Sequence, residues 1–464
     1  MTRTLVTETK NLTGKEVDLY GWVAARRDHG KIIFIDLRDR SGIVQIVFTP
    51  SDKEMYSMAE KLRSEWVVHI KGKVNFRPEK MINPELKTGK IEIESLKLEI
   101  LNEAQTPPFA LDTDGYEIGE ESRMKYRYLD LRRHRLTKNL AIRHMSATFI
   151  RNWLSAKDFI EVETPILTKS TPEGARDYVV PSRLYGGKFY ALPQSPQQYK
   201  QLLMVGGLER YFQIAKCFRD EDTRGDRQPE FTQLDLEMSF VSREDVININ
   251  ERLLIDLIKN IFPEKKIQEI PFPHFSYKEV MEKYGTDRPD LRHNKNDPDL
   301  LAFCWVIDFP FFEKTDSPDG WTFTHNPFSA PKPEFMDSLL KKKNIGDIIT
   351  SQYDVVMNGL EIGGGSIRNH QPEALEAVFE IMGFKKERIQ SNFGHMIDAL
   401  GYGAPPHGGI AWGFDRLMAI LNNEPNIREV IAFPKTGDVR DLMMDSPSEL
   451  ESKQLKELHL KIEK

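Results

Sequence analysis

The fold is decided by residues 216–240, KCFRDEDTRGDRQPEFTQLDLEMSF. An apolar run at 211–214 leads into this stretch, and its central tip is rich in Arg, Asp and Gly. The second half, 231–238, ends in an alternation of polar and apolar residues. Alternation with a period of two predicts a strand with two different faces. We therefore predict two antiparallel strands joined by a charged loop.

The polar positions of this hairpin are unusual for strands that should border a core. They are Arg219, Glu221, Gln228, Asp235 and Glu237. Arg beside Glu on a sheet surface, with an aromatic ring at Phe231, suits a ligand that combines a polyphosphate with a flat base. The alternative interpretation is a solvated edge hairpin whose charges pair with one another.

Composition indicates a soluble globular protein of two or three domains, because the chain has 464 residues, 39% hydrophobic and 29% charged. The net charge of −6 argues against a general nucleic-acid coat, although a local basic face remains compatible with it. Cys217 and Cys304 lie in apolar runs and fit no metal spacing, so we expect buried thiols in a reducing compartment. Without a signal peptide or a membrane span, the expected location is the cytoplasm, with no membrane partner.

Residues 1–104 have an all-β pattern. Short strands are expected at 17–23, 32–37, 43–48, 66–70 and 91–95, with one helix at 52–62. This order predicts an OB-fold barrel, a fold that binds single-stranded nucleic acid. The basic residues Arg26, Arg27, Lys31 and Arg38 flank Phe34 and Gln45. This cluster favours a nucleic-acid face; the alternative is a core position for Phe34 and ordinary surface arginines.

Residues 105–135 are expected to form a linker or hinge, beginning at the break Thr106-Pro107-Pro108. Its second part, 123–135, contains six Lys or Arg in thirteen residues. Such a run is either a solvated helix or a contact for a nucleic-acid backbone.

The remaining residues, 136–464, begin with a strong helical pattern. Ala141, Met145, Phe149 and Trp153 repeat at intervals of four and predict an apolar stripe on a helix over 136–157. An alternating strand at 159–165 follows and ends at Pro165, which suits a sheet edge because proline lacks an N–H donor. A long helix beside an edge strand predicts a dimer interface, with Pro165 within it.

Further along the chain, arginines and carboxylates fall on predicted antiparallel strands. Asp354 and Glu361 precede the glycines of 363–365, and Arg368 and Arg416 follow glycine-rich segments. Hard carboxylate oxygens suit Mg²⁺, and guanidinium groups suit phosphates. No P-loop occurs, and no GxGxxG sequence follows a strand, so the common nucleotide sites are excluded.

Three segments in order resemble the signature motifs of class II aminoacyl-tRNA synthetases. Motif 1 lies at about 136–165, motif 2 with FRDE at about 211–240, and motif 3 with GGIAWGFDR at about 405–421. The segments TPEGARDY, QSPQQYK, RQPEFTQLD, GGGSIR and IAFPKTGD resemble bacterial-type aspartyl-tRNA synthetases. The resemblance implies an α+β protein: an OB-fold anticodon-binding domain at 1–104 and, at 136–464, a class II antiparallel catalytic sheet flanked by helices.

One departure from that family concerns the segment between motifs 2 and 3. Bacterial members usually carry an inserted domain there, whereas only about ten residues separate Arg292 from Ala302 in this sequence. The insertion is therefore expected to be absent near 292–302. Because the motif residues are present, its absence bears on contacts with the tRNA acceptor or on regulation rather than on activation chemistry.

The resemblance implies a ligase that joins L-aspartate to the α-phosphate of ATP and passes the aspartyl group to the 3′ end of tRNA(Asp). Its implied catalytic residues are Arg219, Glu361 and Arg416. The implied ATP site comprises Arg219, Asp220, Glu221, Gln228, Phe231, Glu361 and Arg416, together with the backbone of Gly413, Phe414, Asp415 and Arg416. Mg²⁺ is implied as the cofactor, with Asp354 and Glu361 as its ligands.

The implied aspartate site comprises Glu173, Ser195, Gln197, Lys200, Arg219, Asp235, His325 and Arg368. Arg368 as a bidentate partner and Lys200 are expected to bind the side-chain carboxylate. A neutral carboxamide would leave both cations unpaired, so charge separates aspartate from asparagine where shape does not. His325 resembles a mobile-loop histidine that closes over bound aspartate.

For tRNA, the implied anticodon contacts are Arg27, His29, Phe34, Gln45 and Lys80, and the hairpin tip 222–227 is expected to meet the acceptor end. His29 resembles members that also charge tRNA(Asn), whereas Lys80 resembles the strict members. The two indicators conflict, and relaxed specificity is only slightly favoured. The alternatives are an asparaginyl- or lysyl-tRNA synthetase of the same subgroup and a non-catalytic RNA-binding paralogue. A homodimer is expected.

Overall fold

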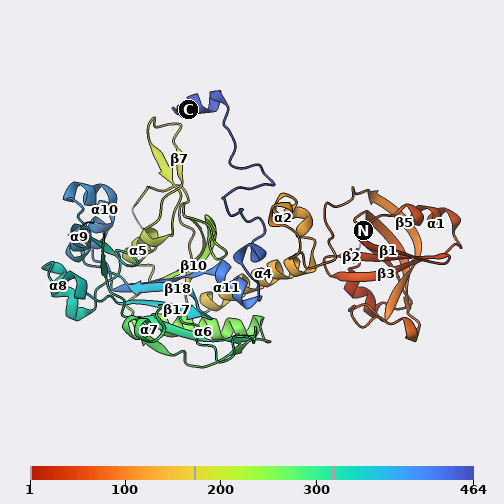
Figure 1. The fold of residues 1–464 in the computed structure, drawn as a ribbon, viewed down its shortest axis with the longest axis horizontal. Helices are drawn as coiled ribbons and strands as arrows, with labels where there is room; N and C mark the ends of the chain where they lie inside the picture. The colour runs from red at the N-terminus through yellow and green to blue at the C-terminus, as the bar shows by residue number, and fades with distance from the viewer. Residues whose placement is uncertain (1–2, 172–173, 316, 318–319, 464) are drawn as a thin grey trace. The chain divides into compact units, whose positions relative to one another are not determined.

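The computed structural model describes residues 3–171, 174–315, 317 and 320–463. The chain divides into two compact units, Met1–Ile118 and Gly119–Lys464 (Figure 1). This division falls inside the segment 105–135 that the sequence marks as a linker. None of the described helices is long and apolar enough to cross a membrane.

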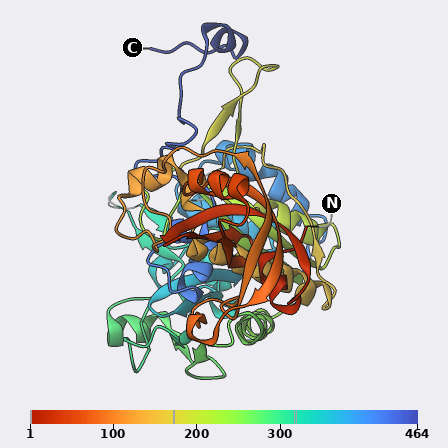
Figure 2. The same cartoon turned by 90° about the vertical axis from the view of Figure 1, so that its right-hand side faces the viewer.

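The first unit is a closed five-stranded barrel in the order β1-β2-β3-β5-β4, whose strands curve around a common interior (Figure 2). Its strands are β1 (Glu16–His29), β2 (Ile32–Asp39), β3 (Gly42–Phe48), β4 (Val67–Phe76) and β5 (Ile91–Asn102), accompanied by η1 (Val6–Asn11) and η2 (Glu79–Met81). Helix α1 (Lys53–Lys61) lies between β3 and β4, and Asp52 caps it by accepting from the amides of Glu54 and Met55. The predicted OB-fold is confirmed, with strands longer than the apolar alternation alone suggested.

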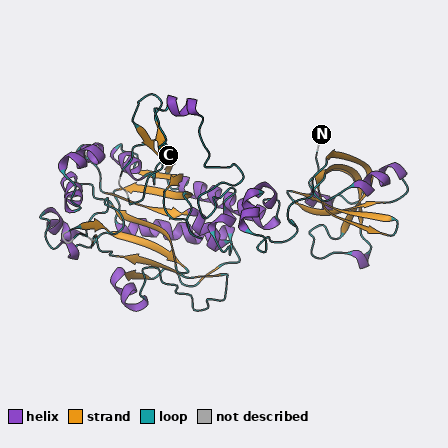
Figure 3. Ribbon diagram, turned by 45° about the horizontal axis from the view of Figure 1, so that its top comes forward, coloured by secondary structure: helices purple, strands orange, loops and turns teal. Residues whose placement is uncertain are grey.

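The second unit is built on an eight-stranded sheet in the order β12-β14-β17-β18-β19-β10-β9-β6 (Figure 3). These strands are β6 (Ile160–Glu161), β9 (Arg210–Phe218), β10 (Glu230–Ser239), β12 (His274–Ser276), β14 (Phe303–Ile307), β17 (Gln352–Met357), β18 (Leu360–Ile367) and β19 (His407–Gly413). Neighbouring strands are antiparallel except at the two ends, where β12 pairs with β14 and β6 with β9 in parallel. The predicted antiparallel hairpin of 216–240 is β9–β10.

The two faces of this sheet differ, as the period-two pattern predicts. Leu234, Leu236 and Met238 of β10 belong to the main apolar core. That core is completed by α4 (His134–Ser155), α6 (Arg243–Ile261) and α11 (Phe414–Leu421). Asp235 and Glu237 alternate with these residues and are also fully buried, so they lie on the opposite, polar face. Helix α5 (Gln197–Val205) contributes Lys200 to that face.

Shorter elements complete the second unit. They are α2 (Glu120–Lys125), α3 (Arg127–Asp130), α7 (Tyr277–Tyr284), α8 (Met336–Leu340), α9 (Pro372–Ile381), α10 (Lys386–Leu400), α12 (Ser452–Glu457), β7 (Val179–Pro181), β8 (Phe189–Ala191), β11 (Lys266–Ile267), β13 (Leu300–Leu301), β15 (Phe312–Lys314), β16 (Trp321–Phe323), η3 (Pro333–Phe335), η4 (Ile345–Asp347) and η5 (Ile427–Val430). The hairpin β7–β8 and the C-terminal α12 lie side by side in both views (Figures 1 and 2).

Helix α4 buries a different stripe from the predicted one. The buried apolar positions are Leu136, Ile142, Ile150 and Leu154, whereas Met145 is 46% exposed. A shift of one residue turns a helix by about 100°, so the predicted stripe points partly to solvent. The strand after it is also shorter than predicted: β6 ends at Glu161, yet it lies at the sheet edge as expected.

The basic segment 123–135 is neither a solvated helix nor an open nucleic-acid contact at its central arginines. Arg123, Arg127 and Arg133 are almost fully buried around Asp130, which accepts from them over 2.7–3.0 Å. Arg123 also donates to Glu429 at 2.7 Å. Both predicted alternatives are therefore wrong for these three residues, because their guanidinium groups form ion pairs with carboxylates inside the protein.

Asp130→Asn is expected to lower the free energy of unfolding by roughly 3–5 kcal/mol, since it removes the carboxylate shared by three buried guanidinium groups. Chemical denaturation followed by circular dichroism measures this difference. Glu161→Gln is the control, because Glu161 pairs with Arg151 at the surface and such pairs contribute about 1 kcal/mol or less. Equal losses for the two variants would contradict the expectation.

Candidate active site

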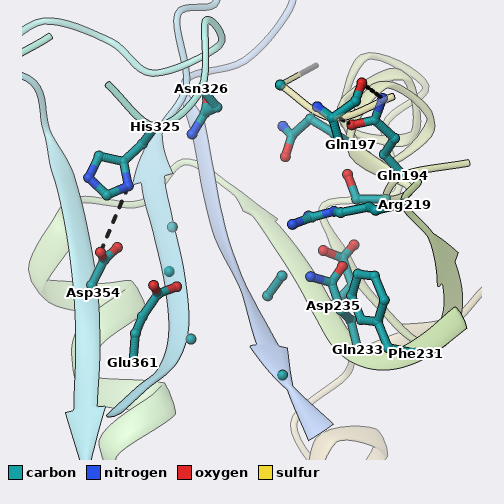
Figure 4. A pocket seen from close by; sticks show the side chains of 18 of the residues that line it. Gln194, Gln197, Arg219, Phe231, Gln233, Asp235, His325, Asn326, Asp354 and Glu361 are labelled. Atoms are coloured by element: carbon teal, nitrogen blue, oxygen red, sulfur yellow. Dashed lines mark hydrogen bonds and ion pairs between the residues drawn. The ribbon is translucent and has the colours of Figure 1, made fainter. Parts of the chain in front are cut away.

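A pocket of about 440 Å³ opens on the polar face of the large sheet. Figure 4 shows His325, Asp354 and Glu361 on one side and Arg219, Phe231 and Asp235 on the other. The predicted site residues that line it are Ser195, Gln197, Lys200, Arg219, Glu221, Gln228, Phe231, Asp235, His325, Asp354, Glu361, Arg368, Gly413, Asp415 and Arg416. The fold thus brings together residues from three separate segments of the sequence, 195–235, 325–368 and 413–416.

One predicted nucleotide contact lies elsewhere. Asp220 lies in a neighbouring depression, with Oδ2 3.4 Å from Nε of Arg176. Phe414 was predicted to contact the nucleotide through its backbone, and its side chain, only 1% exposed, belongs to the apolar core. Glu173 lies outside the described residues.

Unsatisfied donors mark the half of the pocket in which a nucleotide is expected. The guanidinium carbon of Arg219 lies 5.2 Å from the ring centre of Phe231, and the Nε atom of Arg219 is buried without a hydrogen-bond partner among the described residues. Nε of Arg416 and Nε2 of Gln228 are likewise buried without a hydrogen-bond partner among the described residues. Because buried donors are normally satisfied, these three groups indicate that a ligand rich in acceptor oxygens belongs here.

Arg416 also connects two walls of the pocket. It donates to the backbone oxygen of Glu361 on β18 and to Oδ2 of Asp226 at 3.2 Å, in the tip of the β9–β10 hairpin. On the same hairpin, Glu221 lies 3.6 Å from Arg227. The tip is thus held near the first turn of α11 by charge.

The other half of the pocket contains four buried charges. Nζ of Lys200 is 2.6 Å from Oδ1 of Asp235 and 3.3 Å from Oε2 of Glu237. Arg368 donates from Nε and Nη2 to the two carboxylate oxygens of Glu237, at 2.8 and 3.1 Å. All four side chains are at most 2% exposed. Two cations and two anions therefore balance in a buried cluster at this end of the pocket.

This arrangement changes the expectation for Arg368. Its fork is engaged by Glu237, and it also donates to Ser366 and to the backbone oxygen of Gly409. We therefore expect Arg368 to offer a ligand its remaining Nη1 hydrogen rather than a bidentate pair. The ammonium group of Lys200 has three N–H donors, and its contacts with the two carboxylates leave one of them for a ligand.

Electrostatics distinguish the two acids of this cluster. Burial raises the pKa of Asp235, and the positive charge of Lys200 opposes that shift. Burial acts on Glu237 too, but Arg368 and Lys200 together hold the pKa of Glu237 below its usual value. Oδ2 of Asp235 has no hydrogen-bond partner among the described residues, so this oxygen is free to accept from a cationic ligand group.

Asp354 and Glu361 form a pair of acids at the opposite wall. Burial and the neighbouring charge of Glu361 raise the pKa of Asp354 well above its usual value. His325 Nδ1 lies 4.0 Å from Asp354 (Figure 4), yet burial lowers the pKa of His325, so the imidazole is neutral near pH 7. A Cβ at Gly364 would stand 2.7 Å from Oδ1 of Asp354, which explains the glycine.

These two acids fit Mg²⁺ held jointly with a ligand. Carboxylate oxygens are preferred by this ion, which usually takes only one or two of them and completes its shell with water and phosphate. Over the described part of the chain, no group of three or more His, Cys, Asp or Glu could hold a metal alone. A divalent ion is therefore expected to bind here together with phosphate rather than in the empty pocket.

Asp354→Asn is expected to stabilise the ligand-free protein, increasingly as pH rises. A carboxyl whose pKa is raised by folding keeps its proton to higher pH in the folded state, so its contribution to stability declines through that range. The melting temperature of the variant should match that of the wild type near pH 4 and exceed it by on the order of 2 °C at pH 8. A constant difference across this range, measured by differential scanning fluorimetry, would contradict the expectation.

Several pocket residues escaped sequence reasoning. They are Gln194, Asp226, Gln233, Asn326 and Gln352. Glu237, which the sequence marked as an unusual polar strand position without assigning it a role, pairs with Lys200 and Arg368 beside the pocket. No sequence signal pointed to Asp226, since its contact with Arg416 depends on the conformation of a loop.

In the barrel, the predicted anticodon residues lie on or beside the outer surface. Phe34 is half-buried between the core residues Ile33 and Ile35, so it is not a core residue. Arg27 is its register partner on β1 and pairs with Asp36 at 2.6 Å. Gln45 donates to Glu92 at 3.0 Å, while His29 at the end of β1 and Lys80 in η2 are exposed.

Comparison with known proteins agrees with this geometry. The family described as "tRNA synthetases class II (D, K and N)" matches residues 119–437, and "OB-fold nucleic acid binding domain" matches residues 17–101. The chain belongs to the class II tRNA synthetases. In this synthetase, the pocket therefore occupies the catalytic sheet and the barrel is the nucleic-acid-binding domain.

The synthetase is 42% identical to "Aspartate--tRNA(Asp/Asn) ligase" of Rubrobacter xylanophilus, over 97% of the chain and 95% of that relative. It is 40% identical to "Aspartate--tRNA ligase" of Macrococcus caseolyticus, over 98% and 97%. The first alignment spans 573 positions, so at least 109 of them have no counterpart in this chain. The asparaginyl-tRNA synthetase of Pyrococcus horikoshii shares the fold, with a TM-score of 0.75, 23% identity and coverage of 94% and 98%.

Proposed function

We propose that the chain is an aspartate–tRNA ligase, which activates L-aspartate with ATP and transfers the aspartyl group to the 3′ end of tRNA(Asp). The observation that carries the proposal is the pair of buried cations, Lys200 and Arg368, beside a pocket with unsatisfied guanidinium donors. The cations suit a side-chain carboxylate, and the donors suit a triphosphate. The names of the relatives support the same activity.

In the proposed reaction, Arg219 binds the α-phosphate and the carboxylate of the amino acid. Its guanidinium group stabilises the charge that develops as the carboxylate oxygen displaces pyrophosphate in line. Phe231 stacks on adenine, Glu221 accepts from the adenine amino group, and Arg416 covers the ring and meets the γ-phosphate. Asp354 and Glu361 would hold Mg²⁺, which neutralises phosphate charge when bound.

Substrate selection follows from the charge balance. The ammonium group of aspartate donates a hydrogen bond to the free oxygen of Asp235, with Ser195 and Gln197 nearby. The side-chain carboxylate then takes the remaining donors of Lys200 and Arg368. Asparagine brings only one acceptor oxygen to these two donors and turns its NH2 group towards the other, so one charged donor loses its acceptor, a penalty on the order of several kcal/mol. Glu173 is proposed to meet the same ammonium group, and His325 is proposed to close over the bound amino acid.

We further propose that the barrel, taken as residues 1–104, binds the anticodon, with 105–135 as hinge and 136–464 as the catalytic domain. Curated relatives at similar identity include both "Aspartate--tRNA(Asp/Asn) ligase" and "Aspartate--tRNA ligase", so identity does not decide between them. Aspartylation of purified tRNA with an asparagine anticodon decides the matter: charging supports relaxed specificity, and its absence supports strict specificity.

The synthetase is proposed to act as a homodimer in the cytoplasm. Edge strand β6 exposes Ile160, and the following segment around Pro165 exposes Ile166 and Leu167, each by 42–53%. Met145 of α4 is exposed to a similar degree. Apolar side chains gathered at a sheet edge and on a neighbouring helix suit a subunit interface.

Amino-acid-dependent exchange of pyrophosphate into ATP tests the proposal. We expect exchange with aspartate and little with asparagine or lysine. Exchange with asparagine or lysine instead would make the chain a synthetase of the same subgroup for that amino acid. Absence of exchange with all three, together with tRNA binding, would support a non-catalytic RNA-binding protein.

A further inference from the structure

Arg143 lies near the middle of α4, outside the pocket itself. Its side chain is 19% exposed, and its Nη1 atom lies 2.6 Å from Oδ1 of Asp415. Its guanidinium carbon lies 4.9 Å from the ring centre of Phe414. Arg143 therefore contacts the first two residues of α11, the helix that carries Arg416.

Asp415 continues this chain of contacts into the pocket wall. Its second oxygen, Oδ2, accepts from the backbone amide of Thr232 at 2.8 Å. Thr232 follows Phe231, and Asp415 precedes Arg416. One carboxylate, 3% exposed, thus connects the helix α4, the strand under the proposed adenine platform and the helix under the arginine that covers it.

Among the described residues, Arg143 is the one cation that forms an ion pair with this carboxylate. A buried carboxylate is stable as an anion only when it is paired and hydrogen-bonded. Without Arg143, the Asp415 carboxylate has no ion-pair partner among the described residues, so it is expected to turn towards water in the pocket, which weakens its hydrogen bond with Thr232. A small displacement of Phe231 relative to Arg416 would then separate the two sides that enclose a flat base.

We propose that Arg143 is a positioning residue for the nucleotide site, acting through Asp415. The proposal rests on the proposed function only in naming ATP as the nucleotide. The effect of Arg143 is confined to the nucleotide half of the pocket. The amino-acid half has its own network of ion pairs, which consists of Lys200, Asp235, Glu237 and Arg368.

The chain offers a closely matched control on the same helix. Arg135 is 16% exposed and pairs with Glu424 and Glu429 at 2.5 and 2.8 Å, away from the pocket. Arg143→Met and Arg135→Met therefore each remove one partly buried guanidinium group from α4. A merely structural role for Arg143 would make their effects alike.

Steady-state pyrophosphate exchange with the full-length variants tests the proposal. Arg143→Met should raise the KM for ATP by about tenfold while the KM for aspartate changes less than about twofold. Arg143→Lys should recover part of the ATP affinity, because it restores the charge without the planar fork. Arg135→Met should leave both KM values unchanged. Equal rises in both KM values, or equal effects of the two Met variants, would overturn the proposal.

A double-mutant cycle examines the route through Asp415. Arg143→Met combined with Asp415→Asn should raise the KM for ATP no further than Asp415→Asn alone, whereas multiplying effects would overturn the route. Calorimetric binding of ATP needs no amino acid, so it tests Arg143 even if the wild type fails to activate aspartate. Should Arg143→Met fail to fold, Arg143→Lys carries the same comparison, and unchanged ATP affinity in that variant would overturn the proposal.

Discussion

Arg219→Ala is expected to reduce the formation of aspartyl-adenylate by on the order of 100-fold or more. Arg219 is placed for this role by two observations: its stacking on Phe231 at 5.2 Å and its unsatisfied Nε atom. Among the described residues, none forms an ion pair with it, so its charge is available to a ligand. Pyrophosphate exchange at saturating ATP and aspartate measures the loss.

The melting temperature should separate lost chemistry from lost structure. Because Arg219 has no ion-pair partner within the described residues, Arg219→Ala should melt close to the wild type. Lys216→Ala is the control from the same hairpin: Lys216 pairs with Glu230 at the surface, and its removal should change the exchange rate less than about twofold. Near-normal exchange in Arg219→Ala would exclude the assigned role.

Lys200→Met is expected to have the second large effect, on both stability and substrate choice. It leaves the buried carboxylates of Asp235 and Glu237 with one cation fewer, so the free energy of unfolding should fall by roughly 3–5 kcal/mol. The kcat/KM for aspartate should fall by on the order of 100-fold or more, and the preference over asparagine should shrink.

Two further variants separate these consequences. Lys200→Met with Asp235→Asn restores the charge balance, so stability should largely return while aspartate activation does not. Lys265→Met is the matched control, because the Lys265 side chain is 1% exposed and pairs with Asp299 outside the pocket. It should lower stability but preserve the kcat/KM of the folded enzyme. Unchanged selectivity in Lys200→Met would refute the charge mechanism.

The sequence predicted those features that depend on local pattern. Period-two alternation placed Asp235 on a strand with a polar face, and glycine-rich segments marked the strands that pass close to the pocket. The barrel followed from five short alternating runs and one helix. These signals are readable because backbone conformation and burial at such positions depend on neighbouring residues in the chain.

Features that depend on distant partners could not be predicted. Nothing near Arg368 in the sequence points to Glu237, 131 positions away, whose carboxylate takes its fork. The basic run 123–135 looked solvent-facing because its anionic partner Glu429 lies 306 positions from Arg123. The rotation of α4 was misjudged for the same reason: several apolar stripes are possible on one helix, and packing against α6 and β-strands selects among them.

Strand β10 has two buried faces, with Leu234 and Leu236 on one face and the carboxylates of Asp235 and Glu237 on the other. A slip of one residue against β9 or β19 would exchange these sets. It would drive Asp235 and Glu237 into hydrocarbon, away from Lys200 and Arg368. A misregistered sheet would therefore be too unstable to persist. Folding errors at this strand should consequently yield unfolded chains for proteolysis rather than compact enzymes that bind tRNA without charging it.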